Sequence, residues 1–301
     1  MSQIDTAAPD RRTGVVLVVV SAVVFSTAGI FTNGVDTDAW GIIFWRGLAA
    51  AAFTAGYLTT RRKLLAEVRA LGRHGLLVAV LMAAGTAAFI PAFKLSSVAN
   101  VALIYASAPF VAAGLAWALI GEAPTRKVIV ASLAAFCGVL VIVSGSLGRP
   151  SLAGDGLALV MTVMMAGTMV VYRARPATTA ALPAMLSSLI LLPFAAIFGD
   201  PLAAPVAELP VLVIFGMVFA VASVTLSEGA RRLPSAETAL LSALEVPLAP
   251  VLAWLILAET TTPRVLLGGA VILFAVMWSQ TRGLSPLRLR DRAVPARRTK
   301  P

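Results

Sequence analysis

Long apolar stretches separated by short polar gaps recur along almost the whole chain. Each stretch holds about 20 residues, the length that a helix needs to cross the hydrocarbon core of a bilayer. Gaps such as NGVDTD and GEAPTRK carry turn-forming residues. We therefore expect an all-α integral membrane protein. Its ten membrane-spanning helices are predicted over 14–34, 38–59, 76–96, 98–120, 127–146, 155–173, 179–198, 209–230, 236–257 and 264–281.

The composition agrees with this class and argues against others. Only 13% of the 301 residues are charged and 59% are apolar, whereas soluble proteins carry about 25% charged residues. The net charge of +10 does not indicate nucleic-acid binding, because the charges lie in the gaps between apolar stretches. The single cysteine, Cys137, excludes an intrachain disulfide and a thiolate metal site. We expect no metal and no cofactor.

Basic residues are unevenly distributed between alternate gaps. With a cytoplasmic N-terminus, 20 of the 24 Lys and Arg residues fall on the cytoplasmic side, and Arg46 lies within a span. Cytoplasmic loops carry an excess of Lys and Arg, so both termini are predicted to be cytoplasmic. The predicted tails are 1–13 and the basic segment 282–301, and a multi-pass location in the cell membrane follows.

The chain also contains an internal repeat. LAWALIGE at 115–122 is echoed by LAWLILAE at 252–259, and LSSVANVALIYASAP at 95–109 aligns with LPSAETALLSALEVP at 233–247. Equivalent segments are five spans apart, an odd number, so the second unit crosses the membrane in the opposite orientation. Inverted repeats are typical of secondary transporters. The predicted domains are a five-helix repeat at 14–146, a linker at 147–154 and a second five-helix repeat at 155–281.

The repeated units resemble a known family. Each has a proline in its fourth helix and a closing Gly-Glu or Ala-Glu before a threonine-containing turn, as in EamA-type transporters of the drug/metabolite transporter superfamily. The second half, LLSALEVPLAPVLAWLILAETTTPRVLLGGAVIL, is the better match. The resemblance implies a secondary transporter that works by alternating access, and the aromatic amino-acid exporters are a candidate subgroup. The first helix, VVFSTAGIFTN, departs from the family by lacking its frequent Trp-Gly.

Polar residues recur at helical spacing on two symmetry-related helices. Thr238, Ser242 and Glu245 form a stripe on the ninth helix, and Asn100 and Ser107 form the equivalent stripe on the fourth. Such stripes either wall a central cavity or join helices by hydrogen bonds. The candidate substrate-binding residues, aromatic and sulfur-containing side chains included, are Glu245, Ser242, Thr238, Asn100, Ser107, Tyr105, Phe89, Met165, Ser223 and Ser227.

Glu245 is the sharpest of these positions. It lies ten residues from its helix start, about 15 Å into the membrane at 1.5 Å per residue. Its carboxylate either binds a substrate ammonium or carries a proton, or else it forms an ion pair with Arg46. Prolines 109, 247 and 250 each remove a helical hydrogen bond, so we consider Pro109, Pro247 and Pro250 either hinges or static kinks.

These features predict a secondary transporter that exports small metabolites, and they favour amino acids, aromatic ones among them, as substrates. Efflux of drugs or cationic compounds is the alternative. An intramembrane enzyme is a remote alternative, because the spans contain no histidine and no aspartate-rich motif. The expected partners are a small-molecule substrate and the lipid bilayer. A monomer is expected, since ten helices can complete the pathway within one chain.

Overall fold

The computed structural model describes residues 7–144, 151–257 and 262–281. The regular secondary structure in these ranges is helical. Ten of its helical stretches are long and apolar enough to cross a membrane, in agreement with the sequence. The predicted tail at 282–301, the first part of the predicted linker and the second octet's Glu259 lie outside the described residues.

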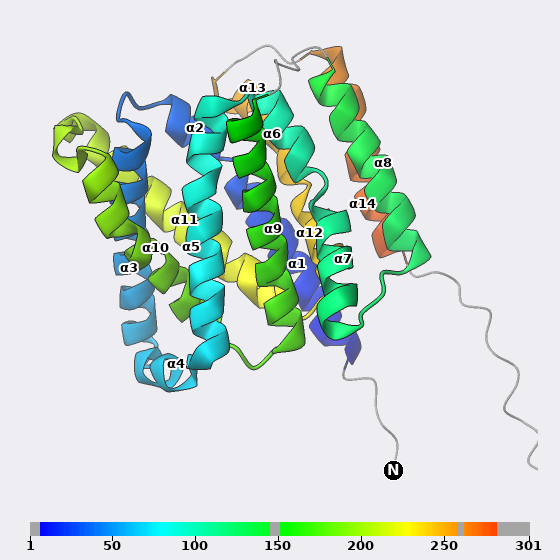
Figure 1. Ribbon diagram of the computed structural model, residues 1–301, viewed down its shortest axis with the longest axis horizontal. Coiled ribbons are helices and arrows are strands. Elements are labelled where there is room, and N and C mark those ends of the chain that lie inside the picture. The colour runs from blue at the N-terminus through cyan, green and yellow to red at the C-terminus, as the bar shows by residue number, and fades with distance from the viewer. Residues whose placement is uncertain (1–6, 145–150, 258–261, 282–301) are drawn as a thin grey trace, which may run out of the picture.

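The helices follow one another without strands between them in the described ranges (Figure 1). In chain order they are α1 (Ala7–Phe25), α2 (Ala28–Asn33), α3 (Ala39–Thr60), α4 (Leu64–Ala70), α5 (Gly72–Leu95), α6 (Val98–Tyr105), α7 (Ala108–Ile120), α8 (Arg126–Val143), α9 (Leu152–Ala174), α10 (Ala181–Phe198), the short 3₁₀ turns η1 (Pro201–Ala203) and η2 (Val206–Glu208), α11 (Leu209–Ala230), α12 (Ser235–Ser242), α13 (Glu245–Leu257) and α14 (Pro263–Gln280).

The predicted helices over 98–120 and 236–257 are each interrupted at mid-span. The first divides into α6 and α7, and the second into α12 and α13. A proline lacks the N–H group and its ring clashes with the carbonyl four residues earlier. For Pro109 and Pro247 those carbonyls belong to Tyr105 and Ala243, at the two breaks. The polar stripe predicted along one continuous helix therefore ends at Ser242, and Glu245 begins a new helix.

The structure differs from the predicted helices in two further places, both involving short helices. The first span is also divided, into α1 and α2, and α1 begins earlier than the predicted residue 14. The basic gap after the second span contains α4, which the sequence did not predict. Its apolar side chains Leu65 and Val68 are exposed next to the basic Lys63 and Arg69. This combination suits a short helix lying at the membrane surface.

The two repeats interlock in a reciprocal way. The first helix of each repeat packs along the third helix of the other: α1 along α11, and α9 along α5. The second helices α3 and α10 pack together, as do the fifth helices α8 and α14. Gly14 and Gly154 occupy equivalent close approaches. A Cβ on Gly14 would lie 2.8 Å from the Arg232 Cβ, and one on Gly154 would lie 2.6 Å from the Leu95 carbonyl carbon.

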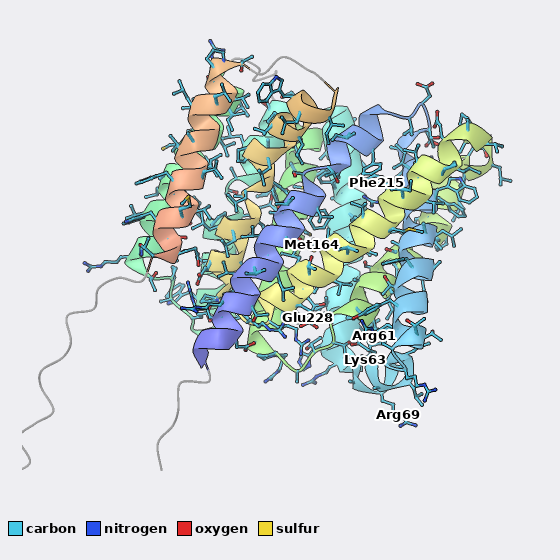
Figure 2. All side chains as sticks on the ribbon, turned by 180° about the vertical axis from the view of Figure 1, so that it is seen from behind. Arg61, Lys63, Arg69, Met164, Phe215 and Glu228 are labelled. Atoms are coloured by element: carbon cyan, nitrogen blue, oxygen red, sulfur yellow. The ribbon has the colours of Figure 1, made fainter. Side chains whose placement is uncertain are left out.

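The ends of the bundle differ in charge. The start of α1 and α4 lie at one end, and α2 and α13 lie at the other (Figure 1). Arg61, Lys63, Arg69 and Glu228 gather at the end that carries α4 (Figure 2). We call this the basic end, and the end with α2 and α13 the opposite end.

Candidate functional site

Glu245 is the first residue of α13 and directly follows the break in the ninth span. The span runs from Ser235 to Ile256, so its carboxylate is near the middle of the crossing. A carboxylate in the first turn is stabilised by the helix dipole. Glu245 is within electrostatic range of the Tyr105 hydroxyl, at the end of α6. Within the described part of the chain, its carboxylate makes no ion pair or hydrogen bond.

The hydroxyls nearest to Glu245 in the sequence bind their own helices. Ser242 donates to the Thr238 carbonyl at 3.0 Å, and Thr238 donates to the Pro234 carbonyl at 3.1 Å. Ser107 donates to the Ile104 carbonyl at 2.6 Å. Because the hydroxyl hydrogens are used locally, the oxygen lone pairs remain as acceptors. Such oxygens can receive hydrogen bonds from an ammonium group.

The predicted site residues differ in burial. Thr238, Ser242, Ser223 and Ser227 are buried, whereas Glu245, Asn100, Ser107, Tyr105 and Met165 are half-buried. Tyr105 and Met165 pack against the same two buried clusters, which brings them together between α6 and α9. Phe89 is 40% exposed. Asn100 lies beside Asp155, towards the opposite end, where Ser96 donates a hydrogen bond to Asp155.

Buried hydroxyls without hydrogen bonds lie between α9, α11 and α12. The oxygens of Ser223, Ser235 and Tyr172 have no hydrogen-bond partner among the described residues. Ser227 lies beside the Tyr172 hydroxyl, but without a hydrogen bond of normal geometry. Buried polar groups are nearly always hydrogen-bonded in folded proteins. These side chains therefore form a polar region that the present packing leaves unsatisfied.

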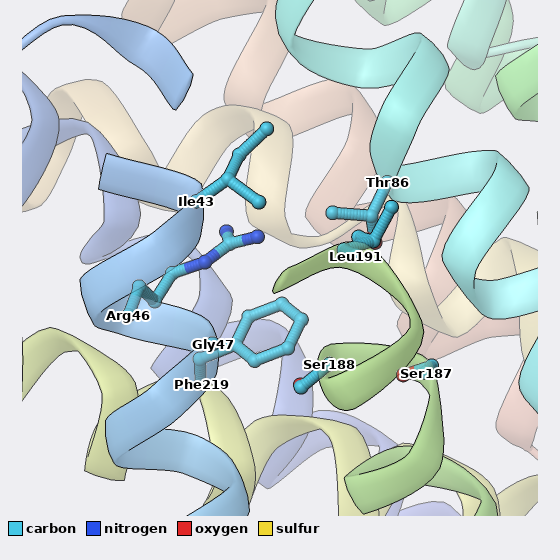
Figure 3. Close-up of a pocket in the computed structure, with 8 residues that line it drawn as sticks. All are labelled: Ile43, Arg46, Gly47, Thr86, Ser187, Ser188, Leu191 and Phe219. Carbon is cyan, nitrogen blue, oxygen red and sulfur yellow. The ribbon is translucent and has the colours of Figure 1, made fainter. Parts of the chain in front are cut away.

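The predicted ion pair of Arg46 with Glu245 is not formed in the structure. The Arg46 guanidinium carbon lies 4.1 Å from the centroid of the Phe219 ring and 5.4 Å from that of Phe215. An arginine placed over an aromatic face is stabilised by the ring quadrupole. The side chain borders a cavity of about 10 Å³ (Figure 3). Its lining residues are Ile43, Arg46, Gly47, Thr86, Ser187, Ser188, Leu191 and Phe219.

Ion pairs at the basic end join the two repeats. Arg11 of α1 pairs with Glu237 of α12, and Arg173 of α9 pairs with Glu122 at 2.5 Å. Glu122 also accepts a hydrogen bond from the Ser235 backbone at 3.2 Å. These contacts were not predicted from the sequence, because the charged residues there indicate topology without indicating their partners. The signal available was an acidic residue, Glu237, in the first turn of a membrane span.

A third connection between the repeats involves Arg232. It pairs with Asp10 of α1 at 2.9 Å and with Glu228 of its own repeat at 2.5 Å. Burial alone would lower the pKa of Arg232, but the hydrogen bonds and charges of Glu228 and Asp10 outweigh it, so the pKa is raised. The arginine therefore remains charged throughout the physiological range and holds α1 against the turn that precedes α12.

Burial is asymmetric between the symmetry-related halves of the broken spans. Every residue of α12 is buried, whereas most of its counterpart α6 is only half-buried. Helix α12 packs against α7 towards the basic end, and no comparable packing joins α6 to α13 within the described residues. Together with the ion pairs, this packing joins the two repeats more tightly at the basic end than at the opposite end.

Known proteins share the fold of this chain and the sequence pattern of its two repeats. A solved structure titled "Crystal structure of protein" is similar to it, with a TM-score of 0.74 and 16% sequence identity over 90% of this chain and 98% of the other. This likeness concerns the fold alone. None of the curated proteins matches the chain in sequence. The pattern of the EamA-like transporter family matches twice, over 12–144 and 152–280. The chain therefore belongs to the EamA-like transporter family, a family of membrane transporters of small molecules and not of enzymes.

Proposed function

We propose that the protein is a secondary transporter that exports amino acids, aromatic ones among them, by alternating access. The observation that carries this proposal is the Glu245 carboxylate, at mid-span and without an ion partner in the described chain. Charges within a membrane normally pair or face a functional cavity. A substrate ammonium would supply the missing positive charge, and Tyr105, which is within electrostatic range of Glu245, offers a ring that suits an aromatic or apolar substrate side chain.

The arrangement of the repeats supports alternating access. The breaks at Pro109 and Pro247 divide two spans next to the candidate site, and such breaks let the half-helices on either side move separately. The distribution of basic residues makes the basic end cytoplasmic. On this orientation, the described packing closes the cytoplasmic side. Substrate is then released to the outside from this state. Loading from the cytoplasm requires the contacts at the basic end to break and contacts between α6 and α13 to form in their place.

The energy source, the oligomeric state and the membrane location complete the proposed function. The sequence has no nucleotide-binding motif, so the gradient of a solute or ion drives transport. Ten spans within one chain can form the complete pathway, and we propose a monomer in the cell membrane with both termini in the cytoplasm.

Efflux of cationic compounds is the second candidate, and a specific observation favours it. Glu245 is a lone carboxylate beside an aromatic side chain, and this pair of groups binds organic cations through charge and the face of the ring. A cation needs no positively charged partner in the site. Amino acids and cationic compounds thus differ in whether they require a second, anion-binding position.

A substrate screen in proteoliposomes tests the proposal and separates the two candidates. Purified protein is reconstituted, and uptake of radiolabelled aromatic, aliphatic and acidic amino acids is compared with uptake of cationic dyes. Protein-free liposomes supply the background. We expect saturable uptake of neutral amino acids, the aromatic ones above all. Uptake of dyes with none of amino acids would establish cationic efflux and contradict amino-acid export.

A further inference from the structure

We propose that the cavity beside Arg46 is a carboxylate-binding subsite for the transported substrate. The inference rests on the proposed function, and it adds a chemical requirement that Glu245 does not impose. The cavity lies between α3, α5, α10 and α11. Arg46 is seven residues in from the start of α3, about 10 Å at 1.5 Å per residue, and so lies well within the span.

Arg46 is a buried cation with unused hydrogen-bonding capacity. Its side chain is 7% exposed, and its Nε atom is buried without a hydrogen-bond partner in the described chain. None of the described ion pairs or hydrogen bonds involves its guanidinium. A guanidinium has five N–H donors in a fixed planar arrangement. Buried arginines are normally paired with an anion, so the missing partner points to a ligand.

The surroundings of Arg46 leave its donors directed at the cavity. Figure 3 shows the guanidinium between Ile43 and Phe219, on the side of the cavity that faces Thr86 and Leu191. The guanidinium carbon lies 4.1 Å from the centroid of the Phe219 ring, and a cation–π contact of this kind uses none of the N–H donors as hydrogen bonds to a lone pair. The aromatic contact therefore holds the group in place and leaves its N–H donors available.

The other polar residues of the cavity are neutral. Ser187 and Ser188 donate to the Ala184 carbonyl at 2.7 Å and 3.4 Å, and the Thr86 hydroxyl has no hydrogen bond within the described residues. No carboxylate is among the described residues that line the cavity. An anion entering it would meet the Arg46 guanidinium and the Thr86 hydroxyl as donors, with no repelling charge on the lining.

The size of the cavity selects a small anionic group. Its volume of about 10 Å³ is close to the ~10–15 Å³ that one water molecule requires. A carboxylate oxygen fits this space, whereas a phosphate group has more oxygens than it can hold. One carboxylate oxygen in this space can accept a charge-assisted hydrogen bond from the Arg46 guanidinium. Chloride is the other small monovalent anion of this size, and it must be distinguished by experiment.

Binding of acetate to the purified protein tests the subsite without requiring transport. The unfolding temperature is measured in sodium acetate and in sodium chloride at equal ionic strength. We expect a higher unfolding temperature in acetate for the wild type. The difference should vanish in Arg46→Gln and persist in the matched control Arg69→Gln, since Arg69 is exposed on α4. Equal unfolding temperatures in the two salts, or a difference that survives Arg46→Gln, would overturn the proposal.

A second experiment compares how tightly an amino acid and its amide compete for the substrate site. For an amino acid that the wild type transports, we expect affinity about ten- to hundredfold higher than for its amide, because a charge-assisted hydrogen bond is lost. Arg46→Gln should weaken binding of the acid and leave that of the amide unchanged. Equal losses for both would indicate a purely structural arginine. Arg46→Lys retains the charge without the paired geometry and should give an intermediate ratio if Arg46→Gln does not fold.

The two arms separate this inference from the proposed function. If acetate stabilises the wild type through Arg46 but no amino acid is taken up, the proposed function is contradicted. The anion-binding subsite would still stand. If the protein takes up amino acids but binds an amino acid and its amide with equal affinity, the proposed function stands and the carboxylate subsite is contradicted. Stabilisation by chloride through Arg46, with acetate giving no more, would assign the cavity to a free anion and overturn the carboxylate proposal.

Discussion

Glu245 and Arg46 carry opposite charges within the membrane spans, yet they do not neutralise one another. Glu245 stands at the break between α12 and α13, beside Tyr105, and Arg46 is held against Phe219. An unpaired charge in a nonpolar region costs several kcal/mol. In the proposed function, the ammonium group of an amino acid compensates Glu245 and its carboxylate compensates Arg46. At the residue scale, the proposal of amino acids as substrates rests on these two unpaired charges.

Replacing the carboxylate of Glu245 tests this case. We expect Glu245→Gln to reduce amino-acid uptake into proteoliposomes by about tenfold or more, because hydrogen bonds to charged groups contribute roughly 1.5–3 kcal/mol. Since glutamine has nearly the same shape, the unfolding temperature should change little. Asp200→Asn is the matched control, because Asp200 is exposed after α10 and should tolerate the same loss of charge. Uptake at the wild-type rate in Glu245→Gln would exclude a substrate or proton role for this carboxylate.

At the scale of helices, the crossing of α8 and α14 depends on two glycines that face each other. A Cβ on Gly138 would lie 2.7 Å from the Gly268 carbonyl oxygen, and a Cβ on Gly268 would collide with the Gly138 carbonyl oxygen. Small residues let membrane helices approach closely and gain dispersion contacts. These helices are the fifth of each repeat, so the contact joins the two repeats along their length.

A single methyl group should weaken this crossing. We expect Gly268→Ala to lower stability by about 1–3 kcal/mol, the usual cost of overpacking, seen as a lower unfolding temperature in detergent. Gly114→Ala provides the control, because a Cβ at Gly114 meets nothing within 4 Å and alanine favours helix. That variant should be as stable as the wild type or more so. Equal stability of Gly268→Ala would mean that the crossing contributes little.

The helices show which parts of the fold can be predicted from sequence. The ten spans are predictable, because bilayer thickness sets a minimum apolar length and turn residues mark each gap. The break before Glu245 is not, because the spacing of Thr238 and Ser242 extends smoothly to residue 245 as if the helix continued. Prolines identify where helical bonds are lost, but tertiary contacts decide how far the helix opens. The surface helix α4 is too short for a span-length criterion.

The candidate site was predictable only in part. Polar spacing indicated Glu245, Ser242 and Ser107, since it depends on local periodicity alone. The environment of Arg46 depends on Phe219, which is far away in the sequence and on another repeat. Likewise, the pairing of Arg11 with Glu237 requires the reciprocal packing of the repeats. Contacts of this kind carry no local signal in a single sequence.

At the scale of the whole molecule, the two repeats are joined more tightly at the basic end than at the opposite end. Ion pairs join the repeats through Arg11, Arg173 and Arg232, and α12 is fully buried between its neighbours. The hydroxyls of Tyr172 and Ser223 are buried and have no hydrogen bond to any residue that the structure describes. Water would satisfy these hydroxyls if the basic end opened. The proposed alternating access predicts a second state, in which the basic end opens and water reaches these hydroxyls.

Cross-linking the basic end tests this account most directly. Glu122 and Arg173 form an ion pair between the repeats, so Glu122→Cys and Arg173→Cys place two thiols within reach of a short bifunctional disulfide-forming reagent. The background is Cys137→Ala, because Cys137 is exposed. Each single-cysteine variant, treated with the same reagent, controls for modification alone.

The measurement is amino-acid uptake by the double variant in proteoliposomes, before cross-linking, after it and after reduction. If transport requires the basic end to open, uptake is lost when the two repeats are joined and returns when the cross-link is reduced, while the single-cysteine variants continue to transport. Uptake at an undiminished rate by the fully cross-linked protein would contradict alternating access through this end.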